Sequence, residues 1–206
     1  MTLDGKEFYF SASHERVDGL VSIDNKPYYF DPAAGKQKNK SFTAEGIHYK
    51  ADSNGVITIP VTSSSTNAEK MLSKGLTYLG TPYGSNLTTM VDCSGLVKLS
   101  LADAGITACR SAAQQWADFG AKNTNIDSPA DLRPGDLIFY TDFRDDCELM
   151  DTTGCETVNE VHHVGIYAGS GQILEASNRD GNKSTLIRQF HDHPGSFICR
   201  FTRVTE

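Results

Sequence analysis

After residue 66 the hydrophobic pattern changes its period once, from helical spacing to short β runs, and that change limits the folds open to this part of the chain. From residue 67 to residue 116 apolar residues recur at helical spacing, as in "NAEKMLSKGLTYL". Asn67 is the expected cap of the first helix, and "LGTPYG" is expected to end it. Short runs rich in β-branched and aromatic residues follow, at 136–140, 163–169, 172–177, 184–190 and 196–201. Helices followed by short strands indicate an α+β domain with a largely antiparallel sheet.

Cys93 stands at the start of the second apolar helix, "VDCSGLVKLSLADAGI" at residues 91–106. The first turn of a helix carries unpaired N–H groups and the positive end of the helix dipole, and both favour a thiolate. A thiol with a lowered pKa is a nucleophile. An isolated cysteine in an apolar helix is more often a buried structural residue, so a catalytic role requires a second feature.

The second feature is "HHVGIYAGSGQILEAS", which places His163 near the start of one strand and Glu175 on the next. The turn "GSG" between them predicts a hairpin. A cysteine nucleophile, a histidine base and a third residue that holds the imidazole form a catalytic set whose members need only be close in space. We therefore predict Cys93, His163 and Glu175 as the catalytic residues.

Residues 1–60 contain a repeat. Tyr9, Tyr29 and Tyr49 are 20 residues apart, and Gly35 and Gly55 each follow their tyrosine by six residues. Each unit is expected to form a short aromatic hairpin, closed by a Gly, Asn or Asp turn, that stacks on its neighbours. The aromatic rings would either offer stacking faces to sugars or a quaternary amine, or fasten the hairpins to one another.

The polar stretch "PVTSSSTN" separates this module from the rest of the chain. The predicted organisation is therefore a small all-β hairpin-repeat module at 1–60, a linker at 61–67 and the α+β domain at 68–206. A net charge of -7 and a pI of 5.3 disfavour a nucleic-acid partner. The chain has no apolar run of about 18 residues for a membrane span and no signal-peptide pattern at residue 1.

Five motifs of the second region carry a family resemblance: "GTPYG", "DCSGLV", "RSAAQ", "LRPGDLIFY" and "HVGIYAGSGQILEA". In order and spacing, residues 68–201 resemble the NlpC family of papain-like cell-wall peptidases. The resemblance implies a papain-like fold and a peptidoglycan endopeptidase without a metal or cofactor. Cys93 would attack the peptide carbonyl, and His163 would transfer the proton. The implied bond joins a γ-D-glutamyl residue to a diamino acid.

The same resemblance assigns supporting residues. Tyr83 is expected near the active site, Asp92 and Ser94 would read the amino end of the stem peptide, and Arg110 and Ser111 would line the groove. Simpler roles are open for each: packing for Tyr83, helix capping for Asp92 and Ser94, and a surface charge for Arg110.

The chain departs from the family pattern in three places. "GSNLTTM" replaces the usual tryptophan and glycines after Tyr83, and Glu175 stands where His, Asn or Gln is usual. An insertion at 142–160 carries seven acidic residues and one basic residue. It is expected to be a solvated loop closed by a Cys147–Cys155 disulfide, or else to attract a cationic part of the substrate. A zinc site built from Cys147, Cys155, His162 and His163 is a further alternative, although it would consume the catalytic base.

The N-terminal units resemble the cell-wall-binding repeats of the choline- or glucan-binding type, although they have no tryptophan, which disfavours choline. The resemblance implies a cell-wall carbohydrate or teichoic acid as ligand. We expect a secreted or surface-directed peptidase, either a mature fragment without its signal peptide or a phage-encoded lysin. The alternatives are a wall-binding protein that has lost hydrolysis and an amidase or acyltransferase on the same scaffold.

Overall fold

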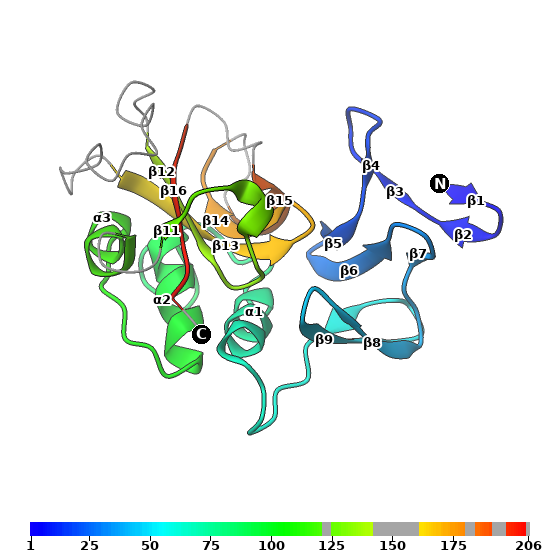
Figure 1. The fold of residues 1–206 in the computed structure, drawn as a ribbon, viewed down its shortest axis with the longest axis horizontal. Helices are drawn as coiled ribbons and strands as arrows, with labels where there is room; N and C mark the ends of the chain where they lie inside the picture. Colours follow the sequence, from blue (N-terminus) through cyan, green and yellow to red (C-terminus); the bar gives the residue numbers. More distant parts are fainter. Residues whose placement is uncertain (121–124, 142–160, 180–183, 191–196, 205–206) are drawn as a thin grey trace.

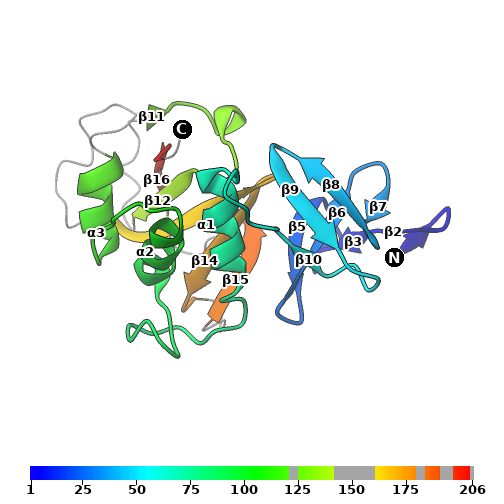
Figure 2. The same ribbon diagram turned by 90° about the horizontal axis from the view of Figure 1, so that it is seen from below.

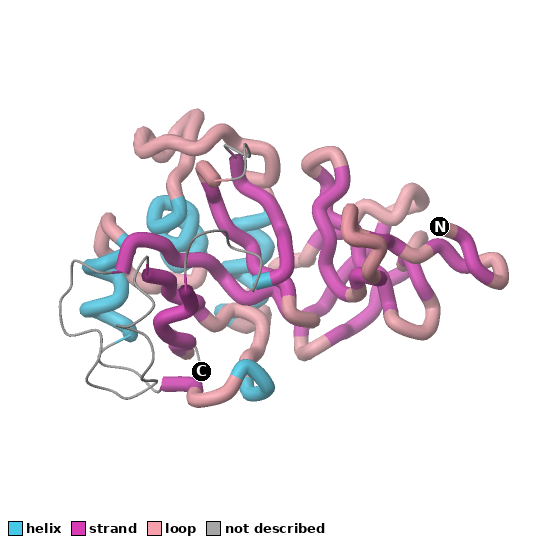
Figure 3. Tube along the Cα trace, turned by 90° about the horizontal axis from the view of Figure 1, so that it is seen from above, coloured by secondary structure: helices cyan, strands magenta, loops and turns pink. Residues whose placement is uncertain are grey.

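The computed structural model describes residues 1–120, 125–141, 161–179, 184–190 and 197–204. It contains two regions that lie side by side (Figure 1). A region of small sheets comes first in the chain, and a six-stranded sheet with helices against it follows. In Figure 3 the N-terminus lies at the end of the small-sheet region farthest from the helices.

The small-sheet region is built from ten short strands that pair antiparallel with near neighbours in the chain. The pairings are β1–β2, β3–β4, β5–β6–β7 and β8–β9–β10. Their bounds are Thr2–Leu3, Lys6–Glu7, Tyr9–Phe10, Arg16–Val17, Gly19–Ile23, Lys26–Asp31, Gly35–Lys36, Lys40–Ala44, Ile47–Ala51 and Ile57–Thr58 for β1 to β10.

Three of these hairpins close through two-residue turns at corresponding places in the repeat: Asp4–Gly5, Asp24–Asn25 and Glu45–Gly46. Both residues of each turn have positive φ angles, between 48° and 81°. This geometry matches the right-handed twist of the flanking strands, and Gly, Asn and Asp adopt it most readily. Small antiparallel sheets are therefore present where hairpins were predicted, while the repeat module and its likeness to wall-binding repeats stay predictions.

The two glycines of the repeat sit where one unit meets the backbone of an earlier one. Gly35 and Gly55 have φ angles of 72° and 83°. A Cβ atom at Gly35 would lie 2.5 Å from the carbonyl oxygen of Glu7, and one at Gly55 would lie 2.9 Å from that of Gln37. Any larger residue would push the units apart, so the glycines let neighbouring hairpins stack closely.

The aromatic residues of the repeat are largely used for packing. The Tyr29 ring centroid lies 5.1 Å from that of Phe42 and 5.2 Å from that of Tyr49. Tyr29 and Tyr49 expose only 6% and 2% of their surface. These two rings therefore fasten hairpins together, which is the second of the two predicted roles.

The helical segments follow. They are α1 Asn67–Leu76, α2 Cys93–Asp103, α3 Ala112–Gln115 with a π-helical turn at Trp116–Gly120, and a 3₁₀ turn at Pro129–Asp131. Thr66, rather than the expected Asn67, caps α1. Its hydroxyl accepts from the amide of Glu69 at 3.2 Å, while the Glu69 carboxylate accepts from the amide of Thr66 at 2.9 Å. This reciprocal capping box satisfies two amides, which Asn67 could not do.

The large sheet has the strand order β11-β16-β12-β13-β14-β15, and all its pairings are antiparallel. Its strands are β11 Asn125–Ile126, β12 Leu137–Thr141, β13 Val161–Gly169, β14 Gln172–Ser177, β15 Ser184–Gln189 and β16 Phe197–Thr202. The five predicted strands are confirmed, and only the two-residue β11 was not expected.

Helix α2 packs against β13 and β14, and α1 packs beside α2 (Figure 2). Leu96, Val97 and Leu101 of α2 share a hydrophobic core with Val164 and Leu174 of the sheet. The opposite face of the sheet holds a second cluster of apolar side chains: Ile126, Leu132, Ile138, Tyr140, Tyr167, Ile173, Phe190 and Phe201.

The core under α1 and α2 continues into the small-sheet region. Leu20, Tyr49 and Ile57 belong to the same buried cluster as Met71 and Leu72 of α1. Strand β5 also contacts β13, β14 and β15. The boundary predicted at 61–67 remains a prediction, but packing across it is continuous.

Polar contacts reinforce this junction between the two regions. The carboxylate of Glu45 accepts from the hydroxyl of Ser170 at 2.6 Å and from its amide at 3.2 Å. Ser170 is the central residue of the "GSG" turn between β13 and β14. The small-sheet region therefore holds the end of the hairpin on which His163 and Glu175 lie.

Candidate active site

Cys93 is the first residue of α2, as its sequence context predicted. Asp92 caps the helix, and its Oδ1 accepts from the amide of Gly95 at 2.7 Å. The thiol is buried at the point where the helix meets the start of β13, and its Sγ lies 3.9 Å from the carbonyl oxygen of His162. The helix terminus thus brings the thiol beside the strand that carries His163.

His163 and Glu175 lie on the neighbouring strands β13 and β14. Nε2 of His163 is 2.6 Å from Oε2 of Glu175, and the carboxylate is completely buried. The ring of Tyr140 lies 5.5 Å from the imidazole, centroid to centroid. These contacts fix the orientation of the imidazole. Because Nε2 contacts Glu175, the other ring nitrogen, Nδ1, is the one that can interact with Cys93.

The electrostatics of the pair favour a thiolate and an imidazolium. Burial disfavours the thiolate, but the charge and hydrogen bond of His163 outweigh it and lower the pKa of Cys93 below its ordinary value. Burial also disfavours the imidazolium, but Cys93 and then Glu175 raise the pKa of His163 to about 9. Each member therefore stabilises the charged form of the other.

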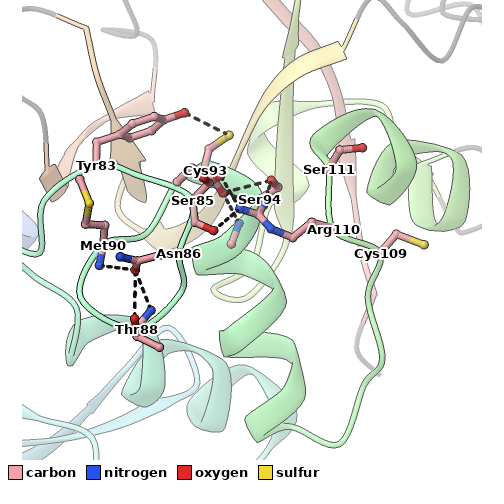
Figure 4. Close-up of polar contacts among 12 residues, drawn as sticks. Tyr83, Ser85, Asn86, Thr88, Met90, Cys93, Ser94, Cys109, Arg110 and Ser111 are labelled. Atoms are coloured by element: carbon pink, nitrogen blue, oxygen red, sulfur yellow. Dashed lines mark hydrogen bonds and ion pairs between the residues drawn. The ribbon is translucent and has the colours of Figure 1, made fainter.

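Tyr83 approaches the thiol from the segment between α1 and α2 (Figure 4). Its hydroxyl donates to Sγ of Cys93 at 4.0 Å. Burial and the neighbouring thiolate raise the pKa of Tyr83, so the phenol keeps its proton. Tyr83 therefore lies at the site, where the sequence placed it.

Asp92, Ser94 and Arg110 form one network beside Cys93. Figure 4 labels Ser94 and Arg110 of this network. Nη1 of Arg110 donates to Oδ1 of Asp92 at 2.9 Å and to the Ser94 hydroxyl at 3.1 Å, and Nη2 reaches the carbonyl oxygen of Ser85 at 3.3 Å. The Asp92 carboxylate is thus both a helix cap and the partner of a guanidinium. The structure brings these three predicted residues together, while their contact with substrate stays a prediction.

Ser111 is the predicted residue that lies apart from this network in Figure 4. It is exposed and caps α3, because its hydroxyl accepts from the amide of Gln114 at 3.2 Å. The Gln114 side chain accepts in return from the amide of Ser111. Its predicted part in substrate binding is therefore not yet supported by a contact.

Two residues of the site were not predicted. Nε of Arg188 on β15 lies 2.8 Å from Oε1 of Glu175. Gln115 is buried, and its amide nitrogen donates to the carbonyl oxygens of Ser94 at 2.8 Å and Cys109 at 3.0 Å. A charged residue inside the apolar run "STLIRQF" was the available signal for Arg188, and Gln115 follows directly after the motif "RSAAQ".

Cys147, Cys155 and the acidic insertion at 142–160 lie outside the described residues. The disulfide and the zinc alternative therefore remain predictions. Within the described part of the chain, no three His, Cys, Asp or Glu side chains are grouped as a metal site would require. No helix there is long and apolar enough to cross a bilayer.

A buried thiol at a helix N-terminus, beside an imidazole from an antiparallel sheet, defines the papain-like class of folds. The chain belongs to the NlpC/P60 family, which it matches over residues 80–193, more than half of its length. The family resemblance found in the sequence is confirmed.

Two curated relatives from Bacillus subtilis are similar to this chain. The bifunctional muramidase/DL-endopeptidase CwlT is 35% identical over 142 residues, which cover 67% of this chain and 38% of that protein. A gamma-DL-glutamyl hydrolase is 36% identical over 133 residues, which cover 62% of this chain and 28% of that protein. The chain therefore matches well under half the length of either relative.

Among solved structures, NlpC1 from Trichomonas vaginalis is similar in fold, with a TM-score of 0.56 at 20% identity. The likeness covers 95% of this chain and 73% of that one. Such coverage includes most of residues 1–60, so the small-sheet region belongs to the shared fold.

Proposed function

We propose that this chain is a cysteine endopeptidase that cleaves stem peptides of peptidoglycan. Cys93 is the nucleophile, His163 is the general base and acid, and Glu175 orients His163. The observation that carries the proposal is the 2.6 Å contact between His163 and Glu175 next to a thiol of lowered pKa. The relatives named as an endopeptidase and a gamma-DL-glutamyl hydrolase support the γ-D-glutamyl bond to a diamino acid as the target.

The reaction follows from the charges of the resting site. The Cys93 thiolate attacks the peptide carbonyl, and amides in the first turn of α2 stabilise the oxyanion. The His163 imidazolium then protonates the departing amine, which leaves a thioester on Cys93. With its proton gone, His163 takes a proton from water, and the resulting hydroxide attacks the thioester. The acyl group leaves as a carboxylate, and the Cys93 thiolate and the His163 imidazolium are restored.

In this proposal the substrate binds beside the thiol, to Tyr83, Asp92, Ser94 and Arg110. Their polar groups form one edge of the site, and the Tyr83 hydroxyl already contacts Sγ. The network carries both a carboxylate and a guanidinium, so it can hold the amino end of a stem peptide and a neighbouring carboxylate together.

The small-sheet region is proposed to keep the enzyme at the wall through carbohydrate or teichoic acid. Tyr29 and Tyr49 are buried, so we assign wall binding to the aromatic cluster of the first unit. Phe8, Tyr9, Phe10 and His14 line an open cavity of about 540 Å³ there. Aromatic faces of this kind can stack on sugar rings. Because the proposed substrate is peptidoglycan, we propose that the protein acts at the cell surface.

The experiment is digestion of purified cell walls, with mass analysis of the released fragments. New termini at the γ-D-glutamyl bond in the parent, and none with Cys93→Ala, would support the proposal. Cleavage between sugar and peptide would indicate an amidase, and transfer to an added amine would indicate an acyltransferase. Equal release by parent and variant would contradict a role for Cys93.

Wall binding is measured separately, in the Cys93→Ala background, by sedimentation with walls. Phe8→Ala should weaken sedimentation, while Tyr28→Ala, outside that cavity, serves as the matched control. Point substitutions suit this test better than deletion of 1–60, because deletion would expose core residues of α1.

A further inference from the structure

The carboxylate of Glu175 lies between two cationic side chains from the neighbouring strands. Oε2 contacts His163 at 2.6 Å, and Oε1 contacts Nε of Arg188 at 2.8 Å. Glu175 pairs with Leu186 across β14 and β15, and Ile173 pairs with Arg188. Arg188 is therefore the diagonal neighbour of Glu175 on the same face of the sheet, within reach of a long side chain.

This contact is buried. The side chain of Glu175 has no exposed surface, and those of His163 and Arg188 are 6% and 13% exposed. A carboxylate so placed stays charged only with a close cationic partner. The imidazole of His163 carries a positive charge for only part of the proposed catalytic cycle, whereas a guanidinium remains charged throughout.

Other titratable groups also face this cluster. Cys93 of α2 acts on His163 from one side, and Tyr140 of β12 lies against the imidazole ring. Tyr83 and Asp92 act on Cys93 in turn. Among these groups, Arg188 is the one whose positive charge does not depend on the protonation of the thiol or the imidazole.

The hydrogen-bond partner of His163 in this chain is a carboxylate, Glu175. An unopposed carboxylate there would hold the imidazolium strongly and make it a poorer proton donor to the leaving amine. A guanidinium beside its second oxygen offsets that pull. Glu175 and Arg188 together then resemble a neutral amide in charge.

We propose that Arg188 is a positioning residue that keeps Glu175 ionised and offsets its charge, so that His163 faces a nearly neutral hydrogen-bond acceptor. This inference rests on the proposed function, in which His163 transfers the proton. It adds that Glu175 can support proton transfer by His163 only when Arg188 is beside it.

The test is a pH titration of the His163 imidazole by NMR in the resting protein, alongside the pH profile of kcat/KM. Arg188→Met removes a positive charge, so the His163 titration and the alkaline limb should both move up by roughly half a pH unit or more. Glu175→Gln should move both downward. Arg188→Lys keeps the charge and should titrate close to the parent.

Arg203→Met is the matched control. Arg203 forms another arginine–carboxylate pair in this domain, 2.8 Å from the buried Asp136. Its loss should lower stability and leave the His163 titration unchanged. If Arg188→Met also left the titration unchanged, Arg188 would be only structural and the proposal would be overturned.

The double variant Glu175→Gln with Arg188→Met carries no unpaired charge, so it should fold even where a single variant does not. It should titrate near the parent and regain activity relative to Glu175→Gln alone. A double variant no better than Glu175→Gln would overturn the proposal. The NMR readout needs no substrate, so the predicted shifts in a protein that cleaves no wall peptide would contradict the proposed function alone.

Discussion

The two regions of the molecule use their buried residues differently. In the first 60 residues, all of which the structure describes, Gln37 is the only buried polar side chain. In the NlpC/P60 region, buried polar and charged residues include Ser94, Gln115, His163 and Glu175, which gather around Cys93. The first region buries apolar side chains that hold its hairpins together. The NlpC/P60 region buries charged groups, at a cost in folding free energy, around the proposed catalytic site.

Cys93→Ala has the largest expected effect and separates the two regions most sharply. Removing the nucleophile should reduce the release of wall peptides by a factor of roughly 10³ or more. Wall sedimentation should change little, because the substitution leaves the small sheets intact. A variant that still released peptides at the parental rate would contradict the proposed mechanism.

Tyr49→Ala tests whether the regions share one core. Tyr49 is 2% exposed and packs on Tyr29, so its loss should cost about 3–5 kcal/mol of unfolding free energy. Urea unfolding should show a single transition for both regions, which tryptophan fluorescence can follow because Trp116 lies in the second region. Two separate transitions, with only one shifted, would show that the regions fold independently.

Glu175→Ala tests the role of the buried polar groups around Cys93. Loss of the carboxylate removes the contact that orients His163, and kcat/KM should fall by a factor on the order of 10 to 1,000. Glu175→Gln keeps a hydrogen-bond acceptor and should lose less. If both variants matched the parent at every pH, another group would have to orient His163.

The pH dependence of stability gives a smaller effect. His163 has a pKa raised to about 9, so the ion pair with Cys93 contributes stability that is lost as the pH rises through that value. The free energy of unfolding should fall between neutral pH and pH values above 9. In Cys93→Ala the imidazolium loses its thiolate partner, so the loss should begin at lower pH. Identical urea profiles for the two proteins would contradict the ion pair.

Glu45→Gln should have the smallest effect. Its contacts with Ser170 are exposed, so the variant should lose about 1 kcal/mol or less. Comparison with Ser170→Ala and the double variant in urea measures the coupling between regions. Additive effects would show that this contact does not join the two regions energetically.

The parts of the structure that depend on local sequence could be predicted, and those that depend on register could not. The period of the apolar residues located α2 and five strands, and the turn "GSG" placed Glu175 on the strand next to that of His163. Arg188 was missed because its contact with Glu175 depends on how β15 aligns with β14. The core shared by the two regions was also missed. A polar linker in the sequence does not show which surfaces pack together on either side of it.

The order of synthesis gives the Glu45–Ser170 contact a further consequence. These residues are 125 positions apart. Strand β5 likewise contacts β13, β14 and β15, which come much later in the chain. Contacts so distant in the chain slow folding, because the chain between them must first be closed into a loop. A growing polypeptide therefore presents Cys93 well before its imidazole and carboxylate exist. The thiol can gain its partners only after β13 and β14 have been made, and the same two strands carry the Ser170 turn that the small-sheet region contacts.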